Sequence, residues 1–184
     1  MERENLYFIA LIPDEQICRE IDVFKSEVAA RFEARQALKV MPHITLKTPF
    51  KMPTTYHHNL LDWFRSLYIT VSSFQIELKN FEAFHNKHSP VIYVKPVINT
   101  PLIVLQNEII RSFGTTYPKS GVNNIEKNFK PHITIAYRDL KPEKFPEAWK
   151  AYRTRIYEAY FEVKKFFLLQ HDSRKWNIIQ AYDI

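Results

Sequence analysis

The sequence predicts an α+β fold in which two pseudo-symmetric lobes of antiparallel sheet, with flanking helices, enclose a central cleft. One short phrase occurs once in each half of the chain: residues 42–46 read PHITL and residues 131–135 read PHITI. Strand-like segments also come in hairpins between helical segments, which does not fit the regular alternation of a parallel sheet. Hydrophobic residues make up 46% of the 184 residues, enough for a buried core. We therefore expect residues 1–184 to form a single domain made of two lobes.

The first elements follow from an apolar run and a helix cap. Residues 6–12 are apolar and rich in aromatic side chains, and Pro13 ends the run, which predicts a buried strand. Asp14 is a typical N-cap, and apolar residues recur at helical spacing from there to about Gln36. The first motif strand is expected over about 43–50.

A second helix and a hairpin are expected next. The helix begins near Thr54, because apolar residues recur at helical spacing over the following turns. Residues 74–84 and 91–97 read as paired strands, and the polar segment 85–90 between them reads as the hairpin tip.

A third helix opens the second half. Asn99 or Thr100 can cap it, Pro101 suits its first turn, and Gly114 is a plausible end. Residues 115–130 are polar and bear lysines, and this composition predicts a long loop.

The last part of the chain returns to strands. The second motif strand is expected over about 132–138, and Pro142 opens a fourth helix that reaches about Tyr157. Residues 161–170 and 176–182 read as a closing antiparallel pair.

The duplicated phrase gives each half one imidazole and one hydroxyl. Side chains alternate between the faces of a strand, so His43 shares a face with Thr45, and His132 shares a face with Thr134. The isoleucine between them takes the opposite face. One such motif alone is most simply a surface histidine beside a strand threonine, but the matched pair favours two motifs that meet around one pocket.

These groups suit the chemistry of a phosphodiester. An imidazole with a pKa near 6.5 can exist in both protonation states near neutral pH, so one histidine can accept a proton while the other donates one. Threonine hydroxyls can donate hydrogen bonds to the non-bridging phosphoryl oxygens. Threonine is not a usual zinc ligand, and the other histidines, among them His171, are scattered and expected to be solvent-exposed. We therefore expect no metal site and no cofactor.

The two hydrophobic-flanked His-x-Thr motifs, His43/Thr45 and His132/Thr134, resemble those of the 2H phosphoesterase superfamily, specifically its bacterial 2′-5′ RNA ligase-like branch. The resemblance covers nearly the whole chain, from a family-like first strand at residues 7–13 to the two closing strands. It implies a two-lobed cyclic phosphodiesterase or 2′-5′ RNA ligase-like enzyme that acts on 2′,3′-cyclic phosphate ends or 2′,5′ linkages of RNA. It also implies that the histidines form the acid–base pair and that the threonines hold the phosphoryl oxygens. The segment KTPFKMP after the first motif departs from the Gly-containing turn that the family often has.

Phosphate binding is expected to come from side chains. The chain has only two glycines, which excludes a glycine-rich phosphate loop, and its formal net charge is +6. Lys47 and Arg138 stand at even offsets from the motif histidines, and Lys130 precedes His132 by two, so all three would share the catalytic face if the strands run straight. They are candidate substrate-binding cations, although ordinary strand-end charges explain them equally well. The net positive charge supports an RNA or nucleotide partner, or it serves solubility alone.

Two other functions remain open at this point: a non-catalytic RNA-binding module with a basic cleft, and a phosphodiesterase of small cyclic nucleotides. The cellular location is predicted from three absences. Cys18 is the only cysteine, residues 1–5 carry two acids and no long apolar run, and no stretch approaches eighteen apolar residues. We therefore expect a cytoplasmic protein with no membrane partner.

Overall fold

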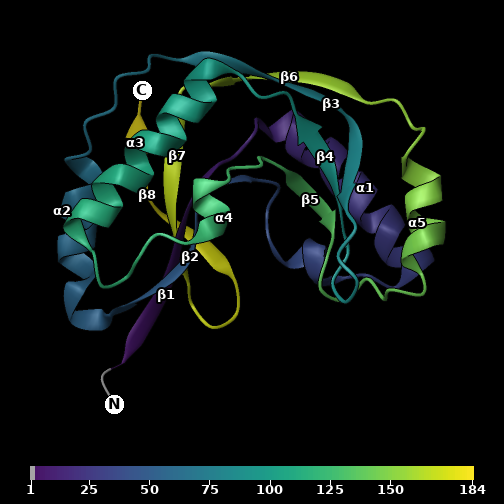
Figure 1. Cartoon of the computed structure of the whole chain (residues 1–184), viewed down its shortest axis with the longest axis horizontal. Coiled ribbons are helices and arrows are strands. Elements are labelled where there is room, and N and C mark those ends of the chain that lie inside the picture. The colour runs from purple at the N-terminus through teal and green to yellow at the C-terminus, as the bar shows by residue number, and fades with distance from the viewer. Residues whose placement is uncertain (1–2) are drawn as a thin grey trace.

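The computed structural model describes residues 3–184, so residues 1–2 of the predicted domain lie outside the described part (Figure 1). Its strands are β1 Glu4–Leu11, β2 Ile44–Pro53, β3 Phe74–Phe84, β4 Val91–Pro96, β5 Ile133–Ala136, β6 Glu158–Val163, β7 Lys165–His171 and β8 Trp176–Asp183. Its α-helices are α1 Glu15–Phe32, α2 His57–Arg65, α3 Thr100–Thr116, α4 Asn124–Lys127 and α5 Phe145–Tyr152. Two short 3₁₀ helices, η1 Gln36–Lys39 and η2 Thr54–Tyr56, precede and follow β2.

The strands form two four-stranded sheets, in the orders β2-β1-β7-β8 and β5-β4-β3-β6. Every neighbouring pair is antiparallel. The two sheets occupy opposite halves of the molecule in Figure 1, which confirms the predicted α+β fold with two antiparallel lobes. The two strands that carry the duplicated phrase, β2 and β5, each form an edge of their own sheet.

The main helices are exchanged between the lobes. α1 lies between β1 and β2 in the sequence, yet it packs against β5 of the other sheet, whereas α3 follows β4 and packs against β2 (Figure 1). Side chains from both sheets accordingly belong to one continuous hydrophobic core, which includes Ile44 and Ile133. Because each motif strand is backed by the helix of the opposite half, the two motifs are held within a shared framework.

Caps fix the beginnings of both long helices. The Asp14 side chain accepts a hydrogen bond from the backbone N–H of Ile17, and Asn99 does the same for Leu102 at the start of α3. α1 ends four residues earlier than expected, because Glu33 adopts a left-handed backbone conformation with φ of 62°. α3 continues through Gly114 to Thr116, so this glycine does not end the helix.

The expected closing antiparallel pair is confirmed as β7 and β8, but the segment expected as its first strand contains parts of two strands. β6 pairs with β3 in the second sheet, whereas β7 pairs with β1 and β8 in the first, so the chain crosses between sheets at Lys164. Residues 161–170 read FEVKKFFLLQ and contain no Gly or Pro that would mark a break between two strands. The preceding helix is also shorter than predicted, since α5 spans only residues 145–152.

The predicted loop over residues 115–130 contains a helical turn. α4 begins with a capping box, in which Asn123 and Glu126 each bond the backbone N–H of the other. Among the described residues, no helix is both long enough and apolar enough to cross a membrane.

Candidate active site

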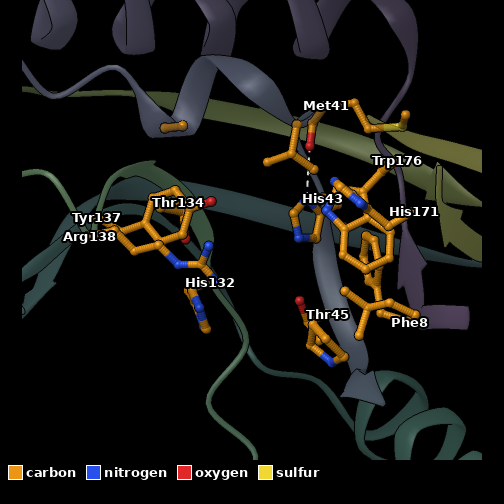
Figure 2. A pocket seen from close by; sticks show the side chains of 14 residues that line it. Phe8, Met41, His43, Thr45, His132, Thr134, Tyr137, Arg138, His171 and Trp176 are labelled. Carbon is orange, nitrogen blue, oxygen red and sulfur yellow. Dashed lines mark hydrogen bonds between the residues drawn. The ribbon is translucent and has the colours of Figure 1, made fainter. Parts of the chain in front are cut away.

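The four motif side chains meet at one cavity of about 410 Å³ between the edge strands β2 and β5. Figure 2 shows one motif on each side of it, with His43 and Thr45 facing His132 and Thr134. The intervening isoleucines are fully buried in the core. The alternation of faces predicted from each His-Ile-Thr segment is therefore confirmed.

Each motif histidine is oriented by the backbone just before it. Nδ1 of His43 lies 2.8 Å from the carbonyl oxygen of Met41, and Nδ1 of His132 lies 2.8 Å from the carbonyl oxygen of Lys130. A carbonyl oxygen can only accept, so Nδ1 carries the proton in both rings. The neutral form of each imidazole therefore has its free lone pair on Nε2, and the two halves repeat this arrangement at the same offset of two residues.

Burial controls the protonation of both rings. Burial is the main cause that lowers the pKa of His43 to about 4; the hydrogen bond to Met41 opposes this effect, and the charges of Lys25 and His132 add to it. Burial also lowers the pKa of His132, against the hydrogen bond to Lys130. Burial therefore favours the neutral form of both imidazoles in the free protein. A phosphate anion between them would favour the protonated form of either ring.

Aromatic side chains provide much of this burial on the first side. The Phe8 ring lies 5.0 Å from the His43 ring, and Trp176 packs edge-on against Phe8 with centroids 4.5 Å apart. His171 in turn packs 5.0 Å from Trp176. Figure 2 shows these three side chains together on the His43 side of the cavity.

The second side is enclosed in a similar way. Phe84 and Tyr93 lie 5.1 and 5.5 Å from the His132 ring, measured between centroids. Tyr93 is also the direct cross-strand partner of Thr134, so β4 supports both polar groups of the second motif.

Lys47 does not face the cavity, and its prediction as a substrate-binding cation is wrong. Its side chain is 2% exposed, and its ammonium group forms a buried ion pair with Glu126 at 2.7 Å. The cause is a β-bulge: Ala10 pairs with Thr45, whereas the preceding Ile9 pairs with Lys47. The extra residue in β2 interrupts the alternation of faces and turns Lys47 into the core.

The two other candidate cations have different positions. Lys130 is exposed and does not line the cavity, but its carbonyl oxygen is the partner of His132. Arg138 lines the cavity, although it lies beyond the end of β5 and has a left-handed φ of 53°. Its guanidinium carbon lies 5.2 Å from the ring centroid of Tyr137, which also lines the cavity.

Sequence reasoning missed one polar group of the cavity. The sequence predicts a solvent-exposed His171 in a turn, but this residue ends β7 and lines the cavity beside Trp176. The backbone N–H of Ser173 donates to its Nδ1 at 3.1 Å, so the neutral ring carries its proton on Nε2. No local pattern marks this residue, because its position depends on the pairing of β7 with β1 across the sheet.

Two carboxylates tie the surroundings of one motif to those of the other. Glu126, just before the second motif, accepts hydrogen bonds from the backbone N–H and the hydroxyl of Thr48 at 3.0 and 2.6 Å. Asp139, just after the second motif, accepts from the backbone N–H groups of Arg35 and Gln36 at 2.6 and 3.0 Å. These contacts join segments far apart in the sequence and hold the two sides of the cavity at a fixed separation.

The two motifs therefore bring two imidazoles and two hydroxyls to a partly enclosed cavity, which Tyr137, Arg138 and His171 also line. In the described part of the chain, no group of three or more His, Cys, Asp or Glu side chains is arranged to hold a metal ion. The set can accept a proton, donate a proton and stabilise negative charge on oxygen.

Comparisons with known proteins show which family this chain resembles. The profile of the family described as the 2'-5' RNA ligase superfamily matches residues 13–175. Two bacterial relatives carry the name "Putative phosphoesterase". The protein from Bacillus cytotoxicus is 29% identical over 157 residues, which cover 84% of each chain. The protein from Geobacillus kaustophilus is 26% identical over 179 residues, which cover 96% of this chain and 94% of its own.

Solved structures share the fold. TT0787 of Thermus thermophilus superposes with a TM-score of 0.70 at 17% identity and 97% coverage of both chains. E. coli LigT complexed with 3'-AMP gives a TM-score of 0.70 at 15% identity and 99% coverage of both chains. The profile match confirms the resemblance inferred from the duplicated motif: the chain belongs to the 2′-5′ RNA ligase superfamily of 2H phosphoesterases.

Proposed function

We propose that the protein is an RNA-processing phosphoesterase that acts on 2′,3′-cyclic phosphate ends or 2′,5′ linkages by His/His acid–base catalysis. One observation carries the proposal: both His-x-Thr motifs line one cavity, with the Nε2 lone pairs of His43 and His132 left free. General acid–base catalysis requires two such groups within reach of the same phosphate.

The chemistry follows from the groups present. In the hydrolysis of a 2′,3′-cyclic phosphate, one histidine takes a proton from water as the water oxygen forms a bond to phosphorus. The bond from phosphorus to one ribose oxygen breaks, and the other histidine, protonated, gives its proton to that oxygen. Thr45 and Thr134 donate hydrogen bonds to the non-bridging oxygens, and Arg138 offsets their charge. The reverse direction exchanges the roles of the two histidines.

The relatives support a phosphate ester of a nucleotide as substrate. The curated relatives carry the name of phosphoesterases, and LigT has been crystallised with 3'-AMP. A 3′-phosphomonoester is the kind of product that opening of a 2′,3′-cyclic phosphate leaves. A cavity of about 410 Å³ lies in the range of small-molecule sites and suits a nucleotide end.

A small cyclic nucleotide is the alternative substrate, and the positions of the cations favour it. Of the three candidate cations, only Arg138 lines the cavity. The ammonium group of Lys47 is buried in an ion pair with Glu126, and the side chain of Lys130 lies outside the cavity. With one cation at the cavity, contacts to phosphates beyond the scissile one depend on other parts of the surface.

The test is incubation of the protein with the four 2′,3′-cyclic mononucleotides and with a short RNA that ends in a cyclic phosphate. Products are identified by ³¹P NMR and by chromatography against 2′- and 3′-phosphate standards. Tighter binding of the RNA, lost steeply as salt rises, supports RNA processing, because each neutralised phosphate releases counterions. Equal affinity and equal salt dependence support the small nucleotide. Absence of turnover on every cyclic phosphate contradicts the enzymatic function and favours a binding module.

The same assay run with EDTA tests whether a metal takes part. Neither motif offers a ligand set of the usual kind, so the rate is expected to be unchanged. A rate that falls with EDTA and returns with added zinc or magnesium would contradict the proton-transfer scheme.

A further inference from the structure

A buried lysine lies behind the first motif. Lys25 of α1 is 1% exposed, and its ammonium group donates to the carbonyl oxygen of Val40 at 2.9 Å. It also forms an ion pair at 2.9 Å with Asp22, whose side chain remains 54% exposed. A lysine is rarely buried in this way, because removing its charge from water is costly unless the charge is paired.

The hydrogen bond of Lys25 acts on the segment that orients His43. Val40 precedes Met41, and the carbonyl oxygen of Met41 accepts the proton of His43 Nδ1. Both Val40 and Met41 line the cavity. Lys25 therefore fixes, from behind, the short extended segment that sets the orientation and tautomer of the imidazole.

In the second half, a neutral buried side chain makes the corresponding hydrogen bond to a backbone carbonyl. Gln106 of α3 is 1% exposed, and its amide donates to the carbonyl oxygen of Glu126 at 3.0 Å, in the segment before the second motif. In each half a buried side chain of a long helix thus holds a carbonyl group upstream of the motif histidine. The donor is a cation in the first half and a neutral amide in the second.

This difference breaks the pseudo-symmetry of the acid–base pair. A positive charge in a poorly solvated region disfavours a second positive charge near it, so Lys25 opposes the formation of imidazolium at His43. Burial lowers the pKa of His132, and the hydrogen bond to the Lys130 carbonyl raises it. The pKa of His43 is lowered in addition by the charge of Lys25. The charged or titratable groups at His43 or on the same cavity are Lys25 of α1 with its partner Asp22, His132 just before β5, Arg138 after β5, and His171 at the end of β7. Lys39 of η1 and Lys175 of the β7–β8 hairpin line a neighbouring cavity together with Val40 and Met41.

We propose that Lys25 is a positioning residue that assigns the proton-accepting role in hydrolysis to His43 and leaves the proton-donating role to His132. The inference rests on the proposed function, because it needs the two histidines to act as an acid–base pair. It adds the direction of proton transfer, which the sequence left open.

The first test is an NMR titration of the histidine side chains in the full chain, which needs no turnover. In Lys25→Met, a neutral side chain of similar length, the pKa of His43 should rise by about one pH unit, and that of His132 should move much less. Lys25→Arg should keep the wild-type value. An unchanged pKa of His43 in Lys25→Met would overturn the proposal.

A second variant keeps the test valid if Lys25→Met does not fold. Asp22→Asn retains the buried lysine and removes its counter-charge at a half-exposed position, so the pKa of His43 should move down instead of up. Glu15→Gln removes an exposed carboxylate from the same helix and should change nothing. A downward shift with Glu15→Gln equal to that with Asp22→Asn would show a general charge effect and contradict the specific role of Lys25.

The pH dependence of kcat/KM on a 2′,3′-cyclic mononucleotide then tests the assignment of roles. In Lys25→Met, the acidic limb should move upward together with the pKa of His43, because the base must be neutral. Movement of the basic limb would make His43 the acid and overturn the assignment. A shift of His43 in a protein that turns over no cyclic phosphate would contradict the proposed function, whereas turnover without that shift would contradict this inference alone.

Discussion

The ammonium nitrogen of Lys47 lies 2.7 Å from a carboxylate oxygen of Glu126, and both side chains are almost fully buried. Lys47 follows the first motif on β2, and Glu126 belongs to α4, six residues before His132. The same carboxylate oxygen accepts two hydrogen bonds from Thr48. This cluster therefore connects the two motif segments and helps to determine the width of the cavity.

Replacing one partner of this pair should be strongly destabilising. Glu126→Gln leaves the ammonium of Lys47 buried without its counter-charge, so the free energy of unfolding in urea should fall by about 3–5 kcal/mol. Glu4→Gln is the matched control. Glu4 forms an exposed ion pair with Lys51, which lies on β2 as Lys47 does, and this pair should contribute less than about 1 kcal/mol. Equal losses in the two variants would show that the buried pair has no special structural role.

The two faces of the second motif strand should separate stability from rate. Ile133 is fully buried, so Ile133→Ala should lower the free energy of unfolding by about 2–5 kcal/mol. Thr134 lines the cavity, so Thr134→Val should keep the fold and lower kcat by about 10²–10³-fold. Urea unfolding and steady-state kinetics on the same preparations measure both effects. Loss of activity with an unchanged melting temperature in Ile133→Ala would contradict the assignment of faces.

The pH profile should lie on the acidic side of neutrality. Burial lowers the pKa of His43 to about 4 and lowers that of His132 as well. With His43 as base, kcat/KM is lost as pH falls through about 4; with His132 as acid, it is lost as pH rises through a pKa below the free value of about 6.5. We expect a bell-shaped pH profile of kcat/KM with its optimum below pH 6.5. The pH profile of kcat should lie at higher pH, because bound phosphate favours imidazolium and so raises the pKa of both rings. A basic limb of kcat/KM above pH 8 would contradict the pKa values of the free protein.

Arg138 should be the cation that binds the scissile phosphate. Arg138→Met removes the only candidate cation that lines the cavity, and kcat/KM on a cyclic mononucleotide should fall by about 10²-fold. Lys130→Met is the control, because its side chain is exposed outside the cavity and its carbonyl group is retained. Similar kinetics for the two variants would mean that neither side chain meets the phosphate.

Local sequence pattern was sufficient for the fold class and for the faces of the two motifs. The two-residue period of a strand determines which side chains share a face, and the burial of Ile44 and Ile133 follows from it. The same period failed at Lys47, because a bulge in β2 depends on its pairing with β1. The position of His171 likewise depends on a sheet formed by strands from both ends of the chain. Pairing between distant strands has no signature within one short segment.

The most direct test of the acid–base pair is a double-mutant cycle on a 2′,3′-cyclic nucleotide. His43→Ala and His132→Ala should each lower kcat by about 10²–10⁴-fold and leave the circular dichroism spectrum unchanged. Because the two imidazoles act on one phosphate, the double variant should lose much less than the product of the two single losses. Turnover near the wild-type level in His132→Ala, or strictly multiplicative losses in the double variant, would contradict the account.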